Sequence, residues 1–391
     1  MNTVLVKEKL TKINRVLAEN TCRDHGFASG TLGLLYYYFH TGDVLADDGL
    51  VSQADGLLEK VFNDINGDGQ GLSGSFLSDG GAGLGWVVNY LHNHGHIDFK
   101  VENEFRDLDL FLFESAQLQL RHDNTDFLYG AMGIFHYFAH REQTPVINRY
   151  LNELATLIVE KPVDTGYGCW VRNYGSHPNK SNEVNFSLSH GLSGYLLALM
   201  EGWHGLKDRE PAEQLIRRGI QFLMKHECPV DFEGQEFSFF PFRFEADSME
   251  IERINRLAWC YGDLNEVLLL YRAGRLLEDD RYIHIANRIG SQTVARRSYA
   301  ATLSKDAHFC HGSSGIARFY KSLYQETGHP CYDDAYQYWL GETLSLVDQE
   351  IAANSYSKNR TGLLEGWPGI GMVLTDYLPG AGNDWARAFL L

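Results

Sequence analysis

The chain has 391 residues, of which 44% are hydrophobic and 22% are charged, a composition typical of a globular protein with a large core. This composition excludes an intrinsically disordered chain, a collagen and a small disulfide-stabilised scaffold. The 34 Lys and Arg residues against 51 Asp and Glu residues give a formal net charge of -17, and because such a field repels phosphate backbones we expect no nucleic-acid partner.

The N-terminal segment places charged residues where a signal peptide needs its apolar core: Lys7, Glu8 and Lys9 interrupt it. No uninterrupted apolar stretch approaches the roughly 20 residues that a membrane helix needs. We therefore predict a cytoplasmic protein without a transmembrane segment. In a reducing compartment the six cysteines are expected to be thiols, because they are too few for a disulfide framework in a chain this long.

A pair of glycines with the spacing G-x-x-G, followed at once by an apolar run, recurs along the chain. The first glycines of these pairs are Gly30, Gly80, Gly130, Gly191, Gly312 and Gly366. A seventh copy begins at Gly262 and has Asn265 in place of its second glycine. The copies follow one another at intervals of roughly fifty to seventy residues, which is typical of a repeat architecture. We predict one domain, residues 1–391, built from seven repeats.

Two kinds of helix are predicted within each repeat. The stretches after the glycine pairs, such as 134–138 and 195–199, are apolar all round, which indicates helices buried on every side. The segments between the pairs, such as 147–158 and 212–223, are apolar on one face with helical period, which indicates helices with one solvated face. Seven of each predict an all-α fold, an α/α toroid of seven inner and seven outer helices. A linear solenoid is the alternative, although the first and last copies are no more polar than the others.

Potential metal ligands occur at one position of the repeat, directly before the first glycine. Cys260 lies two residues before Gly262, and Cys310 and His311 immediately precede Gly312. Because equivalent positions of a repeat lie at the same end of each inner helix, we expect these side chains to converge. Two thiolates and one imidazole form a Cys₂His zinc site with an open fourth position, the pattern of catalytic zinc. Two buried cysteines and a capping histidine are the alternative interpretation.

Two further polar residues precede glycine pairs in the same frame: His190 lies one residue before Gly191, and Asp126 lies four residues before Gly130. Other histidines, such as His136 and His140 within an apolar helix, are expected to be core or rim residues. The chain contains neither G-x-x-x-x-G-K-[ST] nor G-x-S-x-G, so a nucleotide-binding loop and a serine-hydrolase elbow have no support.

Four segments resemble the motifs of the lanthionine synthetase C-like (LanC) cyclase family. They read Ser-His-Gly-Leu-Ser-Gly at 189–194, Trp-Cys-Tyr-Gly at 259–262, Cys-His-Gly at 310–312 and Leu-Glu-Gly-Trp-Pro-Gly-Ile-Gly at 364–371. The resemblance implies an α/α toroid that binds one zinc ion and closes thioether rings in ribosomally made peptides. It also implies a dehydrated precursor peptide as substrate, with a lanthipeptide dehydratase as a possible second partner.

The resemblance also assigns residues to roles. It implies that Cys260, Cys310 and His311 bind zinc, that His190 is the acid–base residue with Asp126 beside it, and that Arg256 and Tyr261 are further active-site residues. The chain departs from the family pattern at Leu192 and Ser193, where Ile-Pro is usual, and at Asn265, where glycine is usual. Neither departure touches the expected ligands.

The implied reaction is addition of a metal-held cysteine thiolate to dehydroalanine or dehydrobutyrine, which gives lanthionine or methyllanthionine. In our hypothesis His190 delivers a proton to the α-carbon, Asp126 orients it, and Arg256 or Tyr261 stabilises the enolate oxygen.

Three other functions remain open at this stage. A LanC-like transferase would add free glutathione to dehydroamino acids in proteins. The β-subunit of a protein prenyltransferase is another zinc-containing α/α toroid, but its ligands include an aspartate and lack this Cys-His pair. A scaffold that only binds peptide would not need an intact ligand set.

Overall fold

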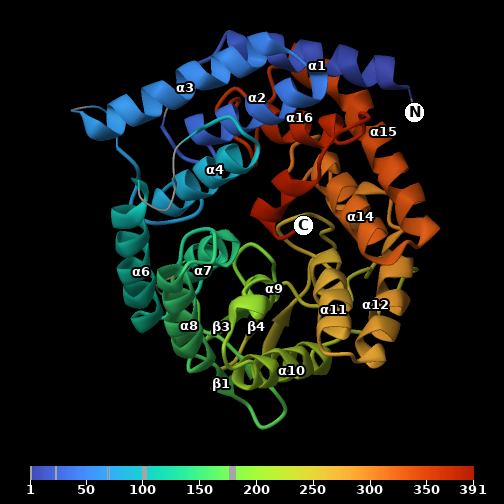
Figure 1. Cartoon of the computed structure of the whole chain (residues 1–391). Helices are drawn as coiled ribbons and strands as arrows, with labels where there is room; N and C mark the ends of the chain where they lie inside the picture. The colour runs from blue at the N-terminus through green and yellow to red at the C-terminus, as the bar shows by residue number, and fades with distance from the viewer. Residues whose placement is uncertain (1, 23, 68, 70, 99–103, 176–181) are drawn as a thin grey trace. The chain divides into compact units, whose positions relative to one another are not determined.

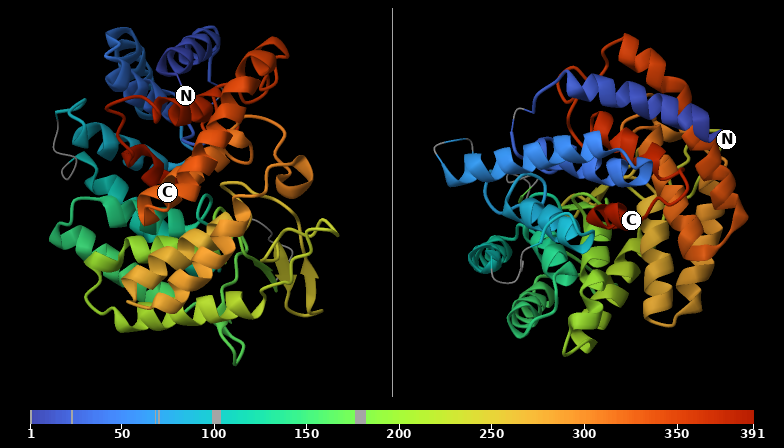
Figure 2. Two further views of the ribbon diagram at one scale, coloured as in Figure 1. Left: turned by 90° about the vertical axis from the view of Figure 1, so that its right-hand side faces the viewer. Right: turned by 45° about the horizontal axis from the view of Figure 1, so that its top comes forward.

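The computed structural model describes residues 1–391 except 1, 23, 68, 70, 99–103 and 176–181. The described chain is mostly helical, with a few short strands (Figures 1 and 2). It forms two compact units, the first comprising Met1–Val101 with Ser304–Leu391 and the second Glu102–Leu303. Within the described residues, no helix combines the length and the apolar character that crossing a membrane would require.

The first unit combines helices from both ends of the chain. They are α1 (Thr3–Ala18), α2 (Thr31–Leu45), α3 (Asp48–Asn66), α4 (Gly81–Asn93), α14 (Ser313–Thr327), α15 (Pro330–Ala352) and α16 (Trp367–Thr375), followed by the 3-10 helix η2 (Asp384–Phe389). Helix α2 packs against α3, α4 and α16, and α14 packs against α15 and α16. The two ends of the chain therefore share one core.

The second unit contains the middle of the chain. Its helices are α6 (Arg106–Arg121), α7 (Ala131–His140), α8 (Pro145–Val159), α9 (Leu192–Glu201), η1 (Trp203–Gly205), α10 (Glu210–Lys225), α11 (Leu264–Leu276), α12 (Asp280–Thr293) and α13 (Tyr299–Thr302). Helix α9 lies against both α7 and α11. This packing places the turns that precede these three helices close to one another.

Two small antiparallel sheets complete the second unit. Strand β1 (Val163–Asp164) pairs with β2 (Cys169–Trp170), and β3 (Glu183–Asn185), β4 (Arg243–Glu245) and β5 (Glu250–Glu252) form a sheet in the order β3-β4-β5. Segment 236–244 is rich in aromatic residues. The structure places only its end in a strand, β4, which pairs with β3 on one side and β5 on the other.

The glycine pairs mark helix starts, as predicted. The first glycine of a pair is the N-cap residue of α2, α4, α7, α9, α14 and α16. The second glycines Gly33, Gly83, Gly194 and Gly369 have no room for a side chain, because the preceding loop lies against the helix. A Cβ added at Gly194 would lie 1.8 Å from the Leu188 carbonyl oxygen, and one at Gly369 would lie 2.0 Å from that of Leu363. These four pairs thus hold a loop tightly on the first turn of a helix.

Burial separates the helices into the two predicted kinds. In α9 every residue from Leu192 to Met200 is buried. Helix α8 buries one face, formed by Ile147, Tyr150, Leu151, Leu154, Ala155 and Ile158. That face is the one that the helical period in the sequence had indicated.

Candidate active site and metal centre

His190 and Asp126 come from the turns before two packed helices, α9 and α7. His190 Nδ1 lies 2.9 Å from Asp126 Oδ2, and Asp126 is completely buried. Because α7 contacts α9, the turns that start the two helices meet. The structure therefore brings these two sequence-predicted residues into a direct ion pair.

The carboxylate of Asp126 is held rigidly by further hydrogen bonds. Its Oδ1 accepts from the backbone N–H groups of Leu128 and Tyr129, both at 2.8 Å. Its Oδ2 also accepts from Asn173 Nδ2 at 2.9 Å, and the same amide donates to the His190 carbonyl at 2.8 Å. Asn173 thus links the two residues of the pair, and the sequence analysis had missed it.

The charge state of His190 is set by two opposing effects. Burial lowers the pKa of this imidazole, but the Asp126 hydrogen bond and the charges of Asp126 and Cys260 raise it more, so its pKa lies above the ordinary value. The side chain keeps 22% of its surface exposed. Since Nδ1 faces Asp126, Nε2 is the nitrogen available to a substrate.

Tyr261 and Arg256 lie in the loop that leads into α11. The ring centroid of Tyr261 is 6.3 Å from that of His190, and its hydroxyl accepts from Asn185 Nδ2 at 3.4 Å. Burial raises the pKa of Tyr261, so the phenol keeps its proton and can donate a hydrogen bond. Arg256 is half-buried, and its carbonyl accepts from Arg296 Nη2 at 3.4 Å.

The predicted metal ligands also lie in the turns before helices. Cys260 is buried in the turn before α11, and its carbonyl accepts from both the backbone N–H and the hydroxyl of Ser189. Cys310 and His311 lie in the turn before α14, where the Cys310 N–H donates to the Leu364 carbonyl at 2.8 Å. These hydrogen bonds hold each turn in place through its backbone.

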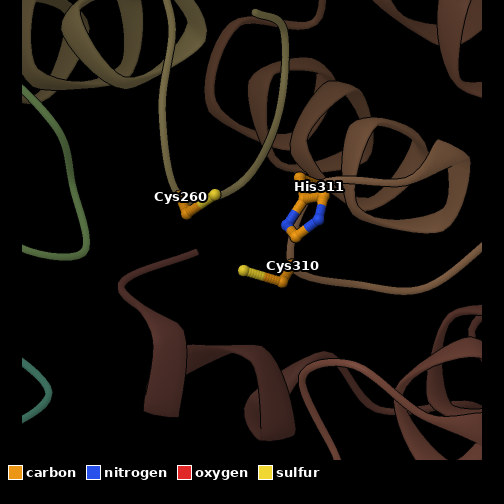
Figure 3. A group of neighbouring side chains, drawn as sticks. All are labelled: Cys260, Cys310 and His311. Atoms are coloured by element: carbon orange, nitrogen blue, oxygen red, sulfur yellow. The ribbon is translucent and has the colours of Figure 1, made fainter. Parts of the chain in front are cut away.

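The ligand atoms of Cys260, Cys310 and His311 converge. One atom from each side chain, two sulfurs and one ring nitrogen, lies within 4.8 Å of the others (Figure 3). Two thiols and an imidazole are the donor types that zinc prefers, and three protein ligands leave a fourth position for a substrate. The donor set therefore fits a single zinc ion.

Comparison with known proteins identifies the family. The model of the family described as "Lanthionine synthetase C-like protein" matches residues 22–390. The chain belongs to this family. The LanC-like chain is 25% identical over 216 residues to the nisin biosynthesis protein NisC of Lactococcus lactis subsp. lactis. The match covers 53% of the LanC-like chain and 48% of NisC, so it spans about half the length of this relative.

The solved structure of nisin cyclase has the same fold as the LanC-like chain. It superposes with a TM-score of 0.77, at 16% sequence identity, over 98% of this chain and 96% of that chain. The departure from the family pattern at Asn265 also has a structural explanation. Its Oδ1 accepts from the Leu188 N–H and its Nδ2 donates to the Trp259 carbonyl, both at 2.9 Å. The amide thus joins the two loops before α9 and α11.

Proposed function

We propose that this LanC-like protein is a zinc-dependent lanthipeptide cyclase. It adds cysteine thiols of a dehydrated precursor peptide to dehydroalanine or dehydrobutyrine and forms lanthionine or methyllanthionine rings. The proposal includes the closed α/α toroid as the arrangement of the whole chain. The observation that carries it is the convergence of Cys260, Cys310 and His311 in a member of the lanthionine synthetase C-like family.

The three ligands suit a thiol substrate. A free cysteine thiol has a pKa of about 8.5 and is mostly protonated at neutral pH. Zinc held by Cys260, Cys310 and His311 would lower the pKa of a substrate thiol at the open position, so that the thiol loses its proton at neutral pH.

The remaining chemistry belongs to the side chains around His190. As the sulfur forms its bond to the β-carbon, the electrons of the carbon–carbon double bond move toward the carbonyl and form an enolate. Protonated His190 gives its Nε2 proton to the α-carbon, and the electrons return to complete the product. Because the pKa of His190 is raised, a protonated donor is available near neutral pH.

Two neighbouring groups complete this assignment. Asp126 binds Nδ1 of His190 and so orients the imidazole with Nε2 toward the substrate. The Tyr261 hydroxyl or the Arg256 guanidinium donates to the enolate oxygen, where negative charge develops during the reaction. Both residues lie in the loop that carries Cys260 into α11.

The proposed reaction has two requirements outside the protein itself. A dehydratase must supply the dehydrated peptide, and we propose it as a second partner beside that peptide. The cysteines of both the substrate and the ligand set must be thiols, which suits the reducing conditions of the cytoplasm.

The test is cyclisation of a dehydrated peptide by the purified protein, followed by alkylation of free thiols and mass spectrometry. We expect the number of alkylated cysteines to fall with time without added glutathione. His190→Ala should slow ring closure by about 10² to 10⁴ and keep its zinc. His284→Ala, an exposed histidine on α12, should react at the unaltered rate.

Three outcomes would contradict the proposal. Turnover that requires added glutathione would instead support the transferase. Loss of zinc from His190→Ala equal to that from Cys260→Ala would make His190 a ligand or a structural residue. Binding of the peptide without any turnover would indicate a scaffold.

A further inference from the structure

Glu266 is a buried acid close to the candidate active site that the proposed reaction does not use. It lies in the first turn of α11 and is 2% exposed. Its Oε1 accepts from the Ser193 hydroxyl at 3.2 Å. Its Oε2 is completely buried and has no hydrogen-bond partner among the residues that the structure describes. A buried oxygen without a hydrogen-bond partner destabilises the folded protein, unless a bound water or ligand provides the partner.

A small cavity is lined in part by Glu266. Its volume is about 10 Å³, and its lining includes Glu266, Tyr261, Ser187 and Ser238. That volume is close to the minimum that holds one water molecule, and a buried water needs two to four polar partners. The cavity is therefore of the right size and polarity for a single water, and too small for a substrate group.

The protonation state of Glu266 strengthens this interpretation. Burial raises the pKa of its carboxyl group well above the ordinary value, and the charge of nearby Asp263 raises it further. The raised pKa favours the neutral carboxylic acid form of the side chain. A neutral acid has a hydroxyl group that must donate a hydrogen bond, and a water in the cavity would accept it.

The other side of the cavity leads to the residues assigned to the reaction. The Ser187 hydroxyl oxygen accepts from the backbone N–H of His190 at 3.1 Å, and the same side chain lies near enough to Tyr261 to lower the pKa of its phenol. Ser187 and Tyr261 both line the cavity. A water between them and Glu266 would join the acid to the loop that carries His190 and to the phenol.

We propose that Glu266 is a positioning residue for Tyr261: through one water molecule in this cavity it binds Ser187 and Tyr261 and holds the phenol in the orientation that the reaction needs. The inference rests on the proposed function, because it assigns Glu266 a role in ring closure through Tyr261. Glu266 does not touch the substrate. Replacing Glu266 changes the rate of ring closure only because the Tyr261 side chain is then held less firmly in its orientation.

Two substitutions by side chains of similar size distinguish a hydrogen-bonding role of Glu266 from a packing role. Glu266→Gln keeps a hydrogen-bond donor and acceptor at the cavity, whereas Glu266→Leu removes both. We expect Glu266→Gln to cyclise within about twofold of the wild-type kcat, and Glu266→Leu to lose about tenfold or more in kcat with little change in KM. Zinc content should be equal in all three proteins.

A double-mutant cycle tests whether the effect passes through Tyr261. Tyr261→Phe removes the hydroxyl group that the water is proposed to hold. In that background, Glu266→Leu should have almost no further effect on kcat, because the two residues act on the same group. Independent, multiplicative losses would show that Glu266 acts through general packing and would overturn the inference.

A spectroscopic measurement keeps the test independent of folding and activity in the leucine variant. The infrared difference spectrum between wild-type protein and Glu266→Gln should show the carbonyl stretch of a neutral carboxylic acid at neutral pH. A carboxylate band in its place would overturn the inference. If wild-type protein forms no rings at all, the proposed function fails; if it forms rings and Glu266→Leu matches it, only the role of Glu266 fails.

Discussion

Replacing Asp126 by Asn tests how the candidate active site is held together. The Asn side chain can keep one oxygen facing the Leu128 and Tyr129 N–H groups, which now donate to Oδ1. Its NH₂ group would then face Asn173 Nδ2 and His190 Nδ1, which now lie 2.9 Å from Oδ2. Two hydrogen bonds to a charged acceptor are lost, each worth about 1.5–3 kcal/mol.

The two lost hydrogen bonds determine how much ring closure should slow. Two bonds together amount to about 3–6 kcal/mol, which corresponds to about 10² to 10⁴ in rate if the ordered, protonated imidazole is needed in the transition state. The pKa of His190 should also fall, because the hydrogen bond and the charge of Asp126 are the two largest effects that raise it against burial. The rate of Asp126→Asn should therefore decline further as the pH rises through neutrality.

Single-turnover cyclisation, followed by thiol alkylation and mass spectrometry, measures the rate, and NMR titration of the His190 ring measures its pKa. Asp123→Asn is the matched control, because Asp123 lies in the same turn and pairs with Lys161 at 3.0 Å, without a hydrogen bond to His190 in the described structure. An Asp126→Asn rate within about threefold of wild type, or an equal loss in Asp123→Asn, would refute this reasoning.

Two further predictions concern stability. Burial raises the pKa of Glu201, but the His140 hydrogen bond and the charges of Arg272, His140 and His136 together outweigh burial and lower this pKa to about 2. Because the folded pKa lies below the unfolded one, the stabilisation of about 3 kcal/mol is present above about pH 4.5 and lost as the pH falls toward 2. Denaturant unfolding of Glu201→Gln should thus differ from wild type at pH 7 and converge with it near pH 2; a constant difference would contradict this. A Cβ at Gly371 would lie 2.3 Å from the Tyr37 ring, whereas one at Gly341 meets nothing within 4 Å. We expect Gly371→Ala to lower the free energy of unfolding by about 1–3 kcal/mol and Gly341→Ala, within helix α15, to raise it by about 0.5–1 kcal/mol. Thermal and denaturant unfolding measure both changes. Equal effects of the two substitutions would show that the contact with Tyr37 is unimportant.

The helical elements were largely predictable because their signals are local. Each glycine pair combines a helix start with a close backbone contact, as at Gly194 against Leu188, so spacing alone located the buried helices. The amphipathic period located the faces of α8 and α10 in the same way. The short strands were less predictable, because β3, β4 and β5 have three residues each, too few for a period. In addition, β3 pairs with β4 although the two are far apart in the chain.

The candidate site was predictable only in part, for a similar reason. Cys260 and Cys310 lie two residues before the first glycine of a repeat, and His190 and His311 lie one residue before it, so aligning the copies selected them as candidates. Their roles came from the family resemblance. Asn173 has no such position. It reaches Asp126 from a loop outside the repeat frame, and only the tertiary fold shows that its amide binds the carboxylate.

Glu266 was missed because of its position in the sequence. An acidic residue in the first turn of a helix is usually solvated and favoured by the helix dipole. Here α11 is buried on all sides at that point, so the acid lies within the protein, beside a cavity of the size of one water. Burial of this kind depends on the neighbouring helices and loops, and the local pattern does not show it.

The zinc content of the purified protein tests the central claim most directly. Elemental analysis should find one zinc ion per wild-type chain, little or none in Cys260→Ala or Cys310→Ala, and one in Cys228→Ala, which removes a buried cysteine outside the ligand set. Wild-type protein that remains free of zinc when purified and refilled with the metal, or ligand variants that bind it as fully as Cys228→Ala, would contradict the account.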